Sequence, residues 1–231
     1  MTPNRTLDRL VEFDERSRDY NVARRLTGLP SGLVSHTWGI PGEKLDQGPD
    51  GACVGFGWAN ELQAYPKAVA GIDYAAAVRI YRAAQKLDGF PDDQDGSSVI
   101  AGAKAVRNAG YIDGFHWAFN INDLCQAVSH LGPAVVGTSW LNSMFDPDPQ
   151  GLLEVDFGSG DAGGHCYLVS GILLESPIAH GAPLLRIRNS WGEGWGRGGD
   201  AFVKVSDFAQ LLVGDGEACI PDGRHKVAAA H

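Results

Sequence analysis

The chain has 231 residues, of which 44% are hydrophobic and 20% are charged, as in an ordinary soluble globular protein. Its net charge of −9 and the lack of a basic run argue against binding to nucleic acid or to an anionic membrane. We find no signal-peptide core and no stretch of transmembrane length, so we expect a cytoplasmic protein. The cysteines are too few for a disulfide framework, and we expect four free thiols: Cys53, Cys125, Cys166 and Cys219.

Residues 1–45 are predicted to form an N-terminal segment with a short amphipathic pattern at Leu7, Leu10 and Val11, followed by polar and turn-rich sequence. Residues 46–132 then read as a helical lobe. Four helices are expected there, each set by a capping residue or by a glycine or proline at its end: 53–65 before Pro66, Asp73 to Leu87 closed by Gly89, Ser97 or Ser98 to Gly110, and Asn122 to Gly132.

The pattern changes after Pro133. Short runs rich in β-branched and aliphatic residues follow, separated by glycine and proline turns, and they predict strands at 134–136, 165–174, 184–188 and 201–205. Residues 133–231 are therefore predicted to be a β-rich, antiparallel lobe. The fold class is α+β, with a helical lobe followed by a barrel-like β lobe.

Four polar residues have the types and the order that thiol chemistry needs. A thiol attacks a carbonyl as thiolate, so it requires a base, and the base requires a group that fixes its ring. Cys53, His165 and Asn189 can supply these three parts. Gln47 lies six residues before the cysteine, where its amide could stabilise an oxyanion together with the backbone N–H of Cys53.

The expected state of the site is an ion pair. Cys53 at the start of a helix would face unpaired N–H groups and the positive end of the helix dipole, and a protonated His165 would add a full charge. Trp191 could shield the bond between His165 and Asn189 from water. Gly163 and Gly164 would let a substrate backbone approach the base.

In this order, Gln47, Cys53, His165 after small residues and the Asn189-Ser-Trp-Gly run resemble the papain-like cysteine peptidases over residues 46–205. The resemblance implies a two-lobed fold and an endopeptidase that forms a covalent thioester, with a protein or peptide substrate and no cofactor or metal. It also implies that Gly96, like Gly164 and Trp191, contacts the substrate.

Two departures from the family pattern stand near the nucleophile. Asp50 replaces a cysteine and Val54 replaces an aromatic residue, so a usual disulfide is missing. The stretch 13–20 and the excess of arginine over lysine, 13 against 6, are similar to actinobacterial and bacteriophage members. Such an origin implies a virion location as an alternative to the cytoplasm.

Alternative interpretations remain at this point. A thiol site of this kind could transfer acyl groups to acceptors other than water or cleave cell-wall peptides, and the fold could also serve as a structural module in a virus particle. Taken singly, Cys53 and His165 are more often buried core residues, and Asn189 suits a turn. The glycine-rich run 192–199 precedes a strand rather than a helix, which argues against a nucleotide site. The histidines do not cluster with cysteines, so we expect no zinc site.

Overall fold

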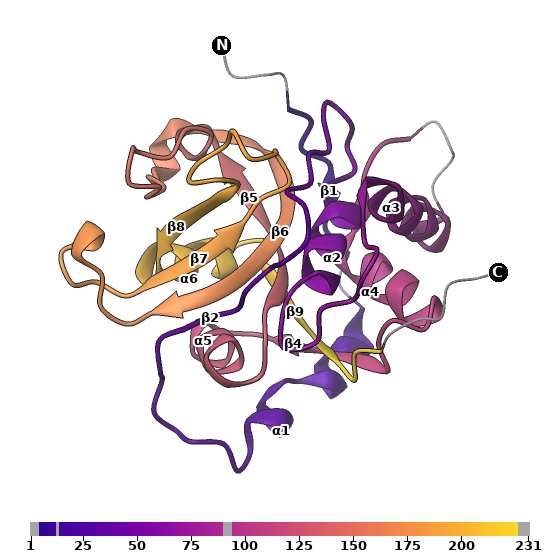
Figure 1. Ribbon diagram of the computed structural model, residues 1–231, viewed down its shortest axis with the longest axis horizontal. Coiled ribbons are helices and arrows are strands. Elements are labelled where there is room, and N and C mark those ends of the chain that lie inside the picture. Colours follow the sequence, from indigo (N-terminus) through magenta and orange to yellow (C-terminus); the bar gives the residue numbers. More distant parts are fainter. Residues whose placement is uncertain (1–4, 13, 90–93, 226–231) are drawn as a thin grey trace.

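The computed structural model describes residues 5–12, 14–89 and 94–225. Outside these ranges lie residues 1–4 of the predicted N-terminal segment, Phe13 at the start of the stretch 13–20, and residues 226–231 of the predicted β-rich lobe. Three helices, α2, α3 and α4, pack on one side of the molecule, and a sheet forms the other side (Figure 1).

The predicted capping residues set the ends of two of these helices. In α3 (Tyr74–Asp88), the side chain of Asp73 accepts from Ala76 N, and Gly89 ends the helix at φ 75°. In α4 (Val99–Asn108), the side chain of Ser98 accepts from Ala101 N. These boundaries follow from local chemistry, because short polar side chains satisfy the free N–H groups of the first turn. The prediction is confirmed for both.

The start of α5 (Ile121–His130) differs from the prediction. Its N-cap is Asn120, whose side chain accepts from Asp123 N, and not Asn122. Two asparagines two residues apart offer the same chemistry, and only Asn120 has the extended backbone that a cap requires, with φ −152° and ψ 164°.

The sheet is antiparallel and has seven strands. Its hydrogen-bonded path runs β4-β9-β5-β6-β7-β8, and β2 pairs with β6 beside that path. Among the described residues the path ends at β4 and β8 and does not close into a barrel. The strand bounds are as follows: β2 His36–Thr37, β4 Gly114–Ala118, β5 Ala134–Leu141, β6 Asp161–Leu173, β7 Leu184–Arg188, β8 Asp200–Lys204 and β9 Glu217–Asp222.

Two clusters of buried side chains form the core. The first lies around α2, α3 and α4 and includes Phe56 and Trp58. The second lies between the sheet, α5 and α6 (Val205–Val213) and includes Trp140 and Phe208. Short 3-10 turns complete the loops: η2 Asn142–Met144, η3 Phe157–Ser159 and η4 Pro177–Ala179. Within the described residues, no helix is both long and apolar enough to cross a membrane.

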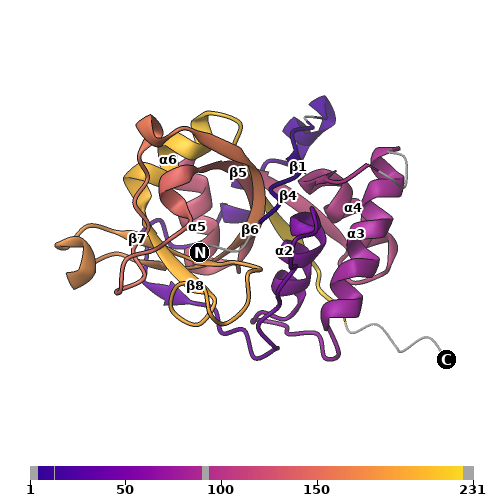
Figure 2. The same cartoon turned by 90° about the horizontal axis from the view of Figure 1, so that it is seen from above.

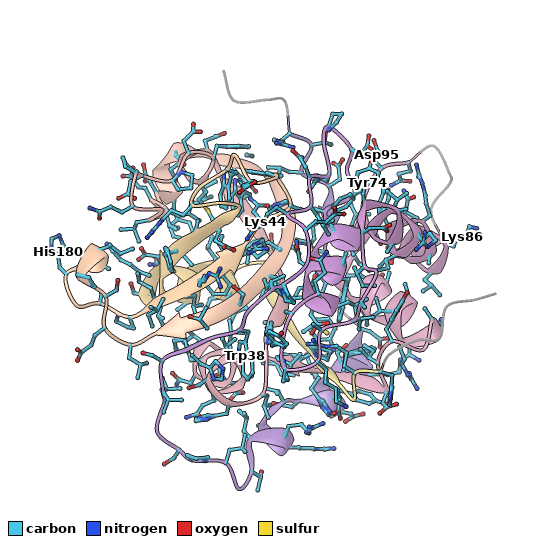
Figure 3. All side chains as sticks on the ribbon, viewed as in Figure 1. Trp38, Lys44, Tyr74, Lys86, Asp95 and His180 are labelled. Carbon is cyan, nitrogen blue, oxygen red and sulfur yellow. The ribbon has the colours of Figure 1, made fainter. Side chains whose placement is uncertain are left out.

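The N-terminal part of the chain touches both sides of the molecule. It contributes β1 (Arg9–Leu10), η1 (Glu15–Tyr20) and α1 (Ala23–Leu26) before it reaches β2. Both views place β1 at the junction between β6 and α2 (Figures 1 and 2). After β2 the indole N–H of Trp38 donates to Val128 O in α5 at 2.7 Å, and Figure 3 shows Trp38 beside that helix.

Candidate active site

Cys53 is the first residue of α2 (Cys53–Leu62), a helix with every residue buried. Its N-cap, Ala52, has no side chain to satisfy the free N–H groups of the first turn, so these groups remain directed at the space before the helix. Glycines allow α2 to pack closely: a Cβ added at Gly57 would lie 2.9 Å from Cys166 Sγ. This packing holds the start of α2 against β6, the strand that carries His165.

The hydrogen bonds of Asn189 define the tautomer of His165. Asn189 Oδ1 accepts from the backbone N–H of Ser190 at 2.8 Å, which identifies this atom as the amide oxygen. The same oxygen lies 2.8 Å from His165 Nε2, so Nε2 carries a proton and donates it. Nδ1 then has the free lone pair, and it has no hydrogen-bond partner among the described residues. The imidazole is set up as a base at Nδ1.

Aromatic side chains surround the pair of His165 and Asn189. The Trp191 ring lies with its centroid 5.0 Å from that of His165, and Trp140 meets the imidazole edge-on at 4.9 Å. Both tryptophans are buried. Since water cannot compete for the bond between Nε2 and Oδ1, the ring orientation is held firmly.

Gln47 is joined to the same motif. Its backbone N–H donates to Ser190 O at 2.9 Å, and Ser190 Oγ donates to Gln47 Oε1 at 2.8 Å. The side-chain Nε2 therefore points the other way, donating to Asp50 O at 2.8 Å and lying 3.5 Å from Thr6 O. Gln47 thus presents an N–H group toward the loop before Cys53 and toward the N-terminal segment.

Residues 5–12, here called the cover segment, run through the site. Asp8 forms a parallel bridge with Gly164, and Arg9–Leu10 pair in parallel with Ser97–Ser98, which form β3. The segment lies so close that a Cβ added at Gly96 would be 2.4 Å from Asp8 O, and one at Gly164 would be 2.3 Å from Arg9 O. The two glycines expected to contact a substrate therefore flank the chain's own backbone.

Arg5 fixes the start of the cover segment. Its guanidinium pairs with Asp46 at 2.5 Å, donates to Trp191 O at 3.3 Å and lies 5.7 Å from the centre of the Trp191 ring. Trp191, expected to contact the substrate, thus contacts the segment.

The cover segment changes the protonation expected from sequence. Burial raises the pKa of the Cys53 thiol to about 11, although backbone hydrogen bonds at Cys166 and Asp8 lower it. Burial also lowers the pKa of His165 to about 4, against the hydrogen bond to Asn189. The expected thiolate and imidazolium pair is therefore wrong for this closed state, because the site is covered and dry and the neutral forms are favoured. Both residues are 0% exposed.

Sequence reasoning missed several residues of the site. Ser190 stands inside the Asn-Ser-Trp-Gly run, so its position was a signal for a role beside Asn189. Trp140 carried no local signal, because it reaches His165 through the pairing of β5 with β6.

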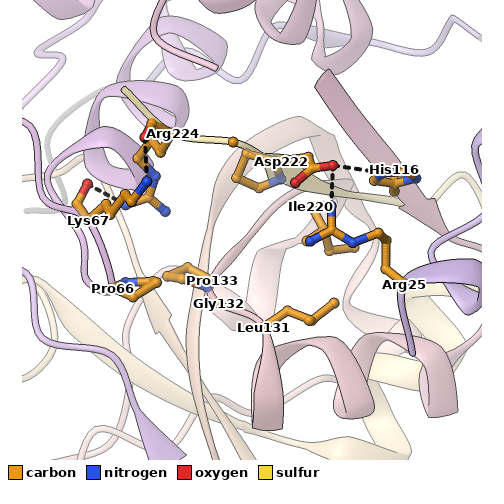
Figure 4. Close-up of a pocket in the computed structure, with 12 residues that line it drawn as sticks. Arg25, Pro66, Lys67, His116, Leu131, Gly132, Pro133, Ile220, Asp222 and Arg224 are labelled. Atoms are coloured by element: carbon orange, nitrogen blue, oxygen red, sulfur yellow. Dashed lines mark hydrogen bonds and ion pairs between the residues drawn. The ribbon is translucent and has the colours of Figure 1, made fainter. Parts of the chain in front are cut away.

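One hollow of the surface lies away from the residues of the site. Figure 4 shows it between the ends of β4 and β9 and the loop after α5, where Asp222 pairs with Arg25 and His116. None of the catalytic candidates lines it. No group of three or more metal-ligating His, Cys, Asp or Glu side chains occurs within residues 5–12, 14–89 and 94–225. All four cysteines are free and buried there.

No protein-family model and no curated protein matches the sequence. Solved structures do match. Xylellain, a cysteine protease from Xylella fastidiosa, is 16% identical with a TM-score of 0.70, covering 97% of this chain and 98% of its own. Digestive procathepsin L 3 from Tenebrio molitor larval midgut is 16% identical with a TM-score of 0.64, covering 95% and 76%. Bromelain from Ananas comosus is 16% identical with a TM-score of 0.56, covering 85% and 100%. The fold is the predicted papain-like α+β fold.

Proposed function

We propose that this protein is a papain-like cysteine endopeptidase. In the open site His165 Nδ1 takes the proton of Cys53, and the thiolate attacks a peptide carbonyl to form a tetrahedral intermediate. Gln47 Nε2 and the backbone N–H of Cys53 stabilise the oxyanion, and the imidazolium gives its proton to the leaving amine. Water then hydrolyses the thioester and regenerates the thiol.

The observation that carries this proposal is the hydrogen-bond pattern around Asn189. One oxygen accepts from both His165 Nε2 and Ser190 N, which leaves Nδ1 unpartnered among the described residues and able to accept a proton. The thiol lies beside the backbone at Cys166, the residue after this histidine. A structural module needs no such arrangement, whereas a base that acts on a thiol does.

The cover segment holds the peptidase closed in this proposal. It lies between Gly96 and Gly164 and against the thiol, so a substrate backbone and residues 7–9 cannot occupy the site together. Opening also lets water reach Cys53 and His165, which removes the burial that favours their neutral forms. Catalysis therefore follows release of the segment.

Cleavage-site profiling of a peptide mixture tests the proposal. The full chain, its Cys53→Ala variant and a Cys125→Ala variant are incubated with the mixture, and new peptide termini are mapped by mass spectrometry. We expect the same termini from the parent chain and Cys125→Ala, and none from Cys53→Ala. The experiment is repeated with Arg5→Ala, which loosens the segment. An open, rapidly alkylated Cys53 that produces no new termini would contradict peptidase activity and favour a structural role.

We propose a cytoplasmic location and an actinobacterial or phage source, with location in a virion if the source is a phage. The support is the arginine-rich basic content, 13 arginines against 6 lysines, which is typical of a GC-rich genome. Detection of the protein in fractionated cells or purified particles of the source tests this.

A further inference from the structure

The side chain of Arg9 fills a buried pocket beside the catalytic residues. It is 1% exposed, its Nη2 donates to Asp215 O at 3.0 Å, and its Nη1 lies 3.6 Å from Glu217 Oε1. Arg9 comes directly after Asp8, whose backbone contacts the Cys53 thiol. The pocket therefore receives the side chain next to the residue that lies at the nucleophile.

The floor of this pocket is an incompletely satisfied carboxylate. Glu217 has a side chain that is 4% exposed, and its Oε1 has no hydrogen-bond partner among the described residues. Arg9 Nε and Nη1 also lack partners there, since 3.6 Å is too long for a hydrogen bond. A buried carboxylate without donors is costly, so this position would not favour Glu for stability alone. A cation that enters the pocket offsets that cost.

The strand pairing leaves room for a long side chain. Gly137 of β5 lies opposite Glu217 of β9, and a Cβ added at Gly137 would meet Arg9 Cδ and Nε at 3.0 Å and Val99 Cγ2 at 2.9 Å. Any larger residue at position 137 would close the passage. The pocket thus has an apolar neck that fits a methylene chain and a polar end that fits a guanidinium.

We propose that this pocket is the specificity subsite of the enzyme and selects substrates with arginine at one position next to the scissile bond, with Arg9 holding the place of that side chain in the closed state. The inference rests on the proposed peptidase function. Two acceptors at the end of the pocket, the Glu217 carboxylate and Asp215 O, suit the forked donors of arginine better than the single ammonium of lysine.

The electrostatic surroundings favour a cation as occupant over an apolar side chain. Burial raises the pKa of Glu217 to about 8, Arg9 acts against this shift, and Glu12 and Asp88 add to it, so a cation in the pocket favours the charged carboxylate. When the segment leaves, Glu12 and Arg9 leave with it, while Asp88 and Glu217 remain with the body of the enzyme. The empty pocket then keeps acidic groups that a substrate arginine neutralises.

Matched peptides test the proposal in the full chain carrying Arg9→Ala, which empties the pocket and loosens the segment by removing its contacts with Asp215 and Glu217. A single arginine is moved along an otherwise constant peptide, and each arginine is also replaced by citrulline, which has the same shape without the charge. We expect one position, next to the mapped cleavage site, at which arginine exceeds citrulline in kcat/KM by about ten- to a hundredfold, the range for a hydrogen bond to a charged group. A peptide with lysine at that position should have a kcat/KM between those of the arginine and citrulline peptides.

Glu217→Gln is placed in the same Arg9→Ala chain. It should bring kcat/KM for the arginine and citrulline peptides to within about twofold of each other, because the charge at position 217 is lost and the shape is retained. Glu154→Gln is the control, since Glu154 is exposed, and it should leave the ratio unchanged. Three results would overturn the proposal: equal kcat/KM for the arginine and citrulline peptides in the Arg9→Ala chain, a higher kcat/KM with leucine at that position, or a ratio that Glu217→Gln leaves unchanged.

The two proposals fail in different ways. If the protein is not a peptidase, no peptide is cut at any position, yet the Cys53→Ala, Arg9→Ala chain should still bind the arginine peptide more tightly than the citrulline peptide in an equilibrium binding measurement. If only the subsite proposal is wrong, peptides are cut through Cys53 but without regard to arginine, and the binding preference is absent too.

Discussion

At the scale of single residues, Ser190 joins Asn189 and Gln47, two residues of the proposed catalytic site. Its N–H holds Asn189 Oδ1, its carbonyl holds the backbone of Gln47, and its hydroxyl donates to Gln47 Oε1. Because Oε1 is engaged, Gln47 can direct only its N–H donors toward the thiol side. The residue that positions the base therefore also fixes the orientation of the oxyanion donor.

This link predicts a graded series of losses. Gln47→Ala should lower kcat by about a hundred- to a thousandfold, the effect of removing one oxyanion donor. Ser190→Ala keeps the donor but frees its orientation, so we expect about a tenfold loss, in line with one buried hydrogen bond. Steady-state kinetics on one peptide substrate measures both. Ser206→Ala, an exposed serine of α6, should have the parent kcat. A parent-like kcat in Ser190→Ala would show that Gln47 needs no such support.

The sequence pointed to the four catalytic candidates because their types and order are specific, and the structure brings Gln47, His165 and Asn189 into one hydrogen-bonded group through Ser190. Their protonation could not be predicted in the same way. The pKa of a thiol or imidazole depends on burial, and here burial comes from a segment 45 residues earlier in the chain than Cys53, as counted from Asp8.

At the scale of helices and strands, local chemistry again predicts some elements, while others depend on contacts between distant parts of the chain. The helices after Asp73 and Ser98 could be predicted because their caps act within three residues. Strands β4 and β9 were missed, since each is short and finds its partner about a hundred residues away, with Phe115 paired to Pro221. Proline in the middle of a run argues against a strand, and only the pairing with β4 and β5 reveals β9. Long-range contacts carry no local pattern.

Closure by the cover segment predicts the reactivity of Cys53. The full chain should react slowly with a small haloacetamide, because the thiol is buried and its pKa is raised to about 11. Arg5→Ala removes the contacts with Asp46 and Trp191, so the alkylation rate should rise at least about tenfold. Arg16→Ala is the control, since the Arg16 side chain is 80% exposed and its described ion pair is with Asp14. Mass spectrometry maps the modified cysteine.

An equal alkylation rate in the parent chain, Arg5→Ala and Arg16→Ala would contradict closure by this segment. A rise in the reactivity of Cys125 together with Cys53 would instead indicate general unfolding, because Cys125 lies buried in the second core cluster.

Two carboxyl groups of the segment should weaken its binding as the pH rises. Burial and the nearby Asp95 raise the pKa of Asp8, and burial and a hydrogen bond with Asp88 raise the pKa of Glu12. At these two groups the closed state takes up protons, and their contribution to its stability is fully present below the ordinary values of 3.8 and 4.5 and declines as the pH rises through the raised values. Asp46 acts in the opposite sense, since its pKa is lowered: burial is outweighed by hydrogen bonds from Arg5 and Gly48. The contribution of Asp46 to the stability of the closed state changes only below pH 3.8.

Hydrogen–deuterium exchange of residues 7–10, corrected for the intrinsic rate at each pH, measures this opening. His165 acts against these carboxyl groups, because burial lowers its pKa to about 4 and closure therefore releases a proton there. Toward neutral pH, protection should fall less, or rise more, in Glu12→Gln than in the parent chain. Identical pH profiles in the two chains would contradict a contribution of Glu12 to closure.

At the scale of the whole molecule, Arg224 ties the C-terminal part of the chain to α2, the helix that begins at Cys53. Its guanidinium contacts Glu61 of α2, a side chain that is 0% exposed, and the backbone carbonyl of Ala64. Burial raises the pKa of Glu61 to about 7, against the pull of Arg224. Stability from this group is therefore greatest below pH 4.5 and is lost as the pH rises through 7.

Arg224→Ala leaves that carboxylate buried without its partner. We expect the free energy of unfolding to fall by about 3–5 kcal/mol at pH 8, as for other broken buried pairs, and by clearly less at pH 5, where Glu61 takes up a proton. Denaturant titration at both pH values measures this. Arg25→Ala breaks a partly exposed pair with Asp222 and should change stability by about 1 kcal/mol or less. Equal losses at the two pH values would indicate that Arg224 acts by packing alone.

The cover segment and the cleft are parts of one polypeptide, and β2 anchors the connection between them by pairing with β6. Closing is therefore a first-order event, with a local concentration of segment in about the millimolar range at any protein concentration. Dilution cannot open the site. A single cut in the connecting residues 21–35 would turn closure into a second-order reaction, and the freed segment would then be lost at low concentration. One proteolytic event in that stretch is enough to convert a reversible cover into a lasting release.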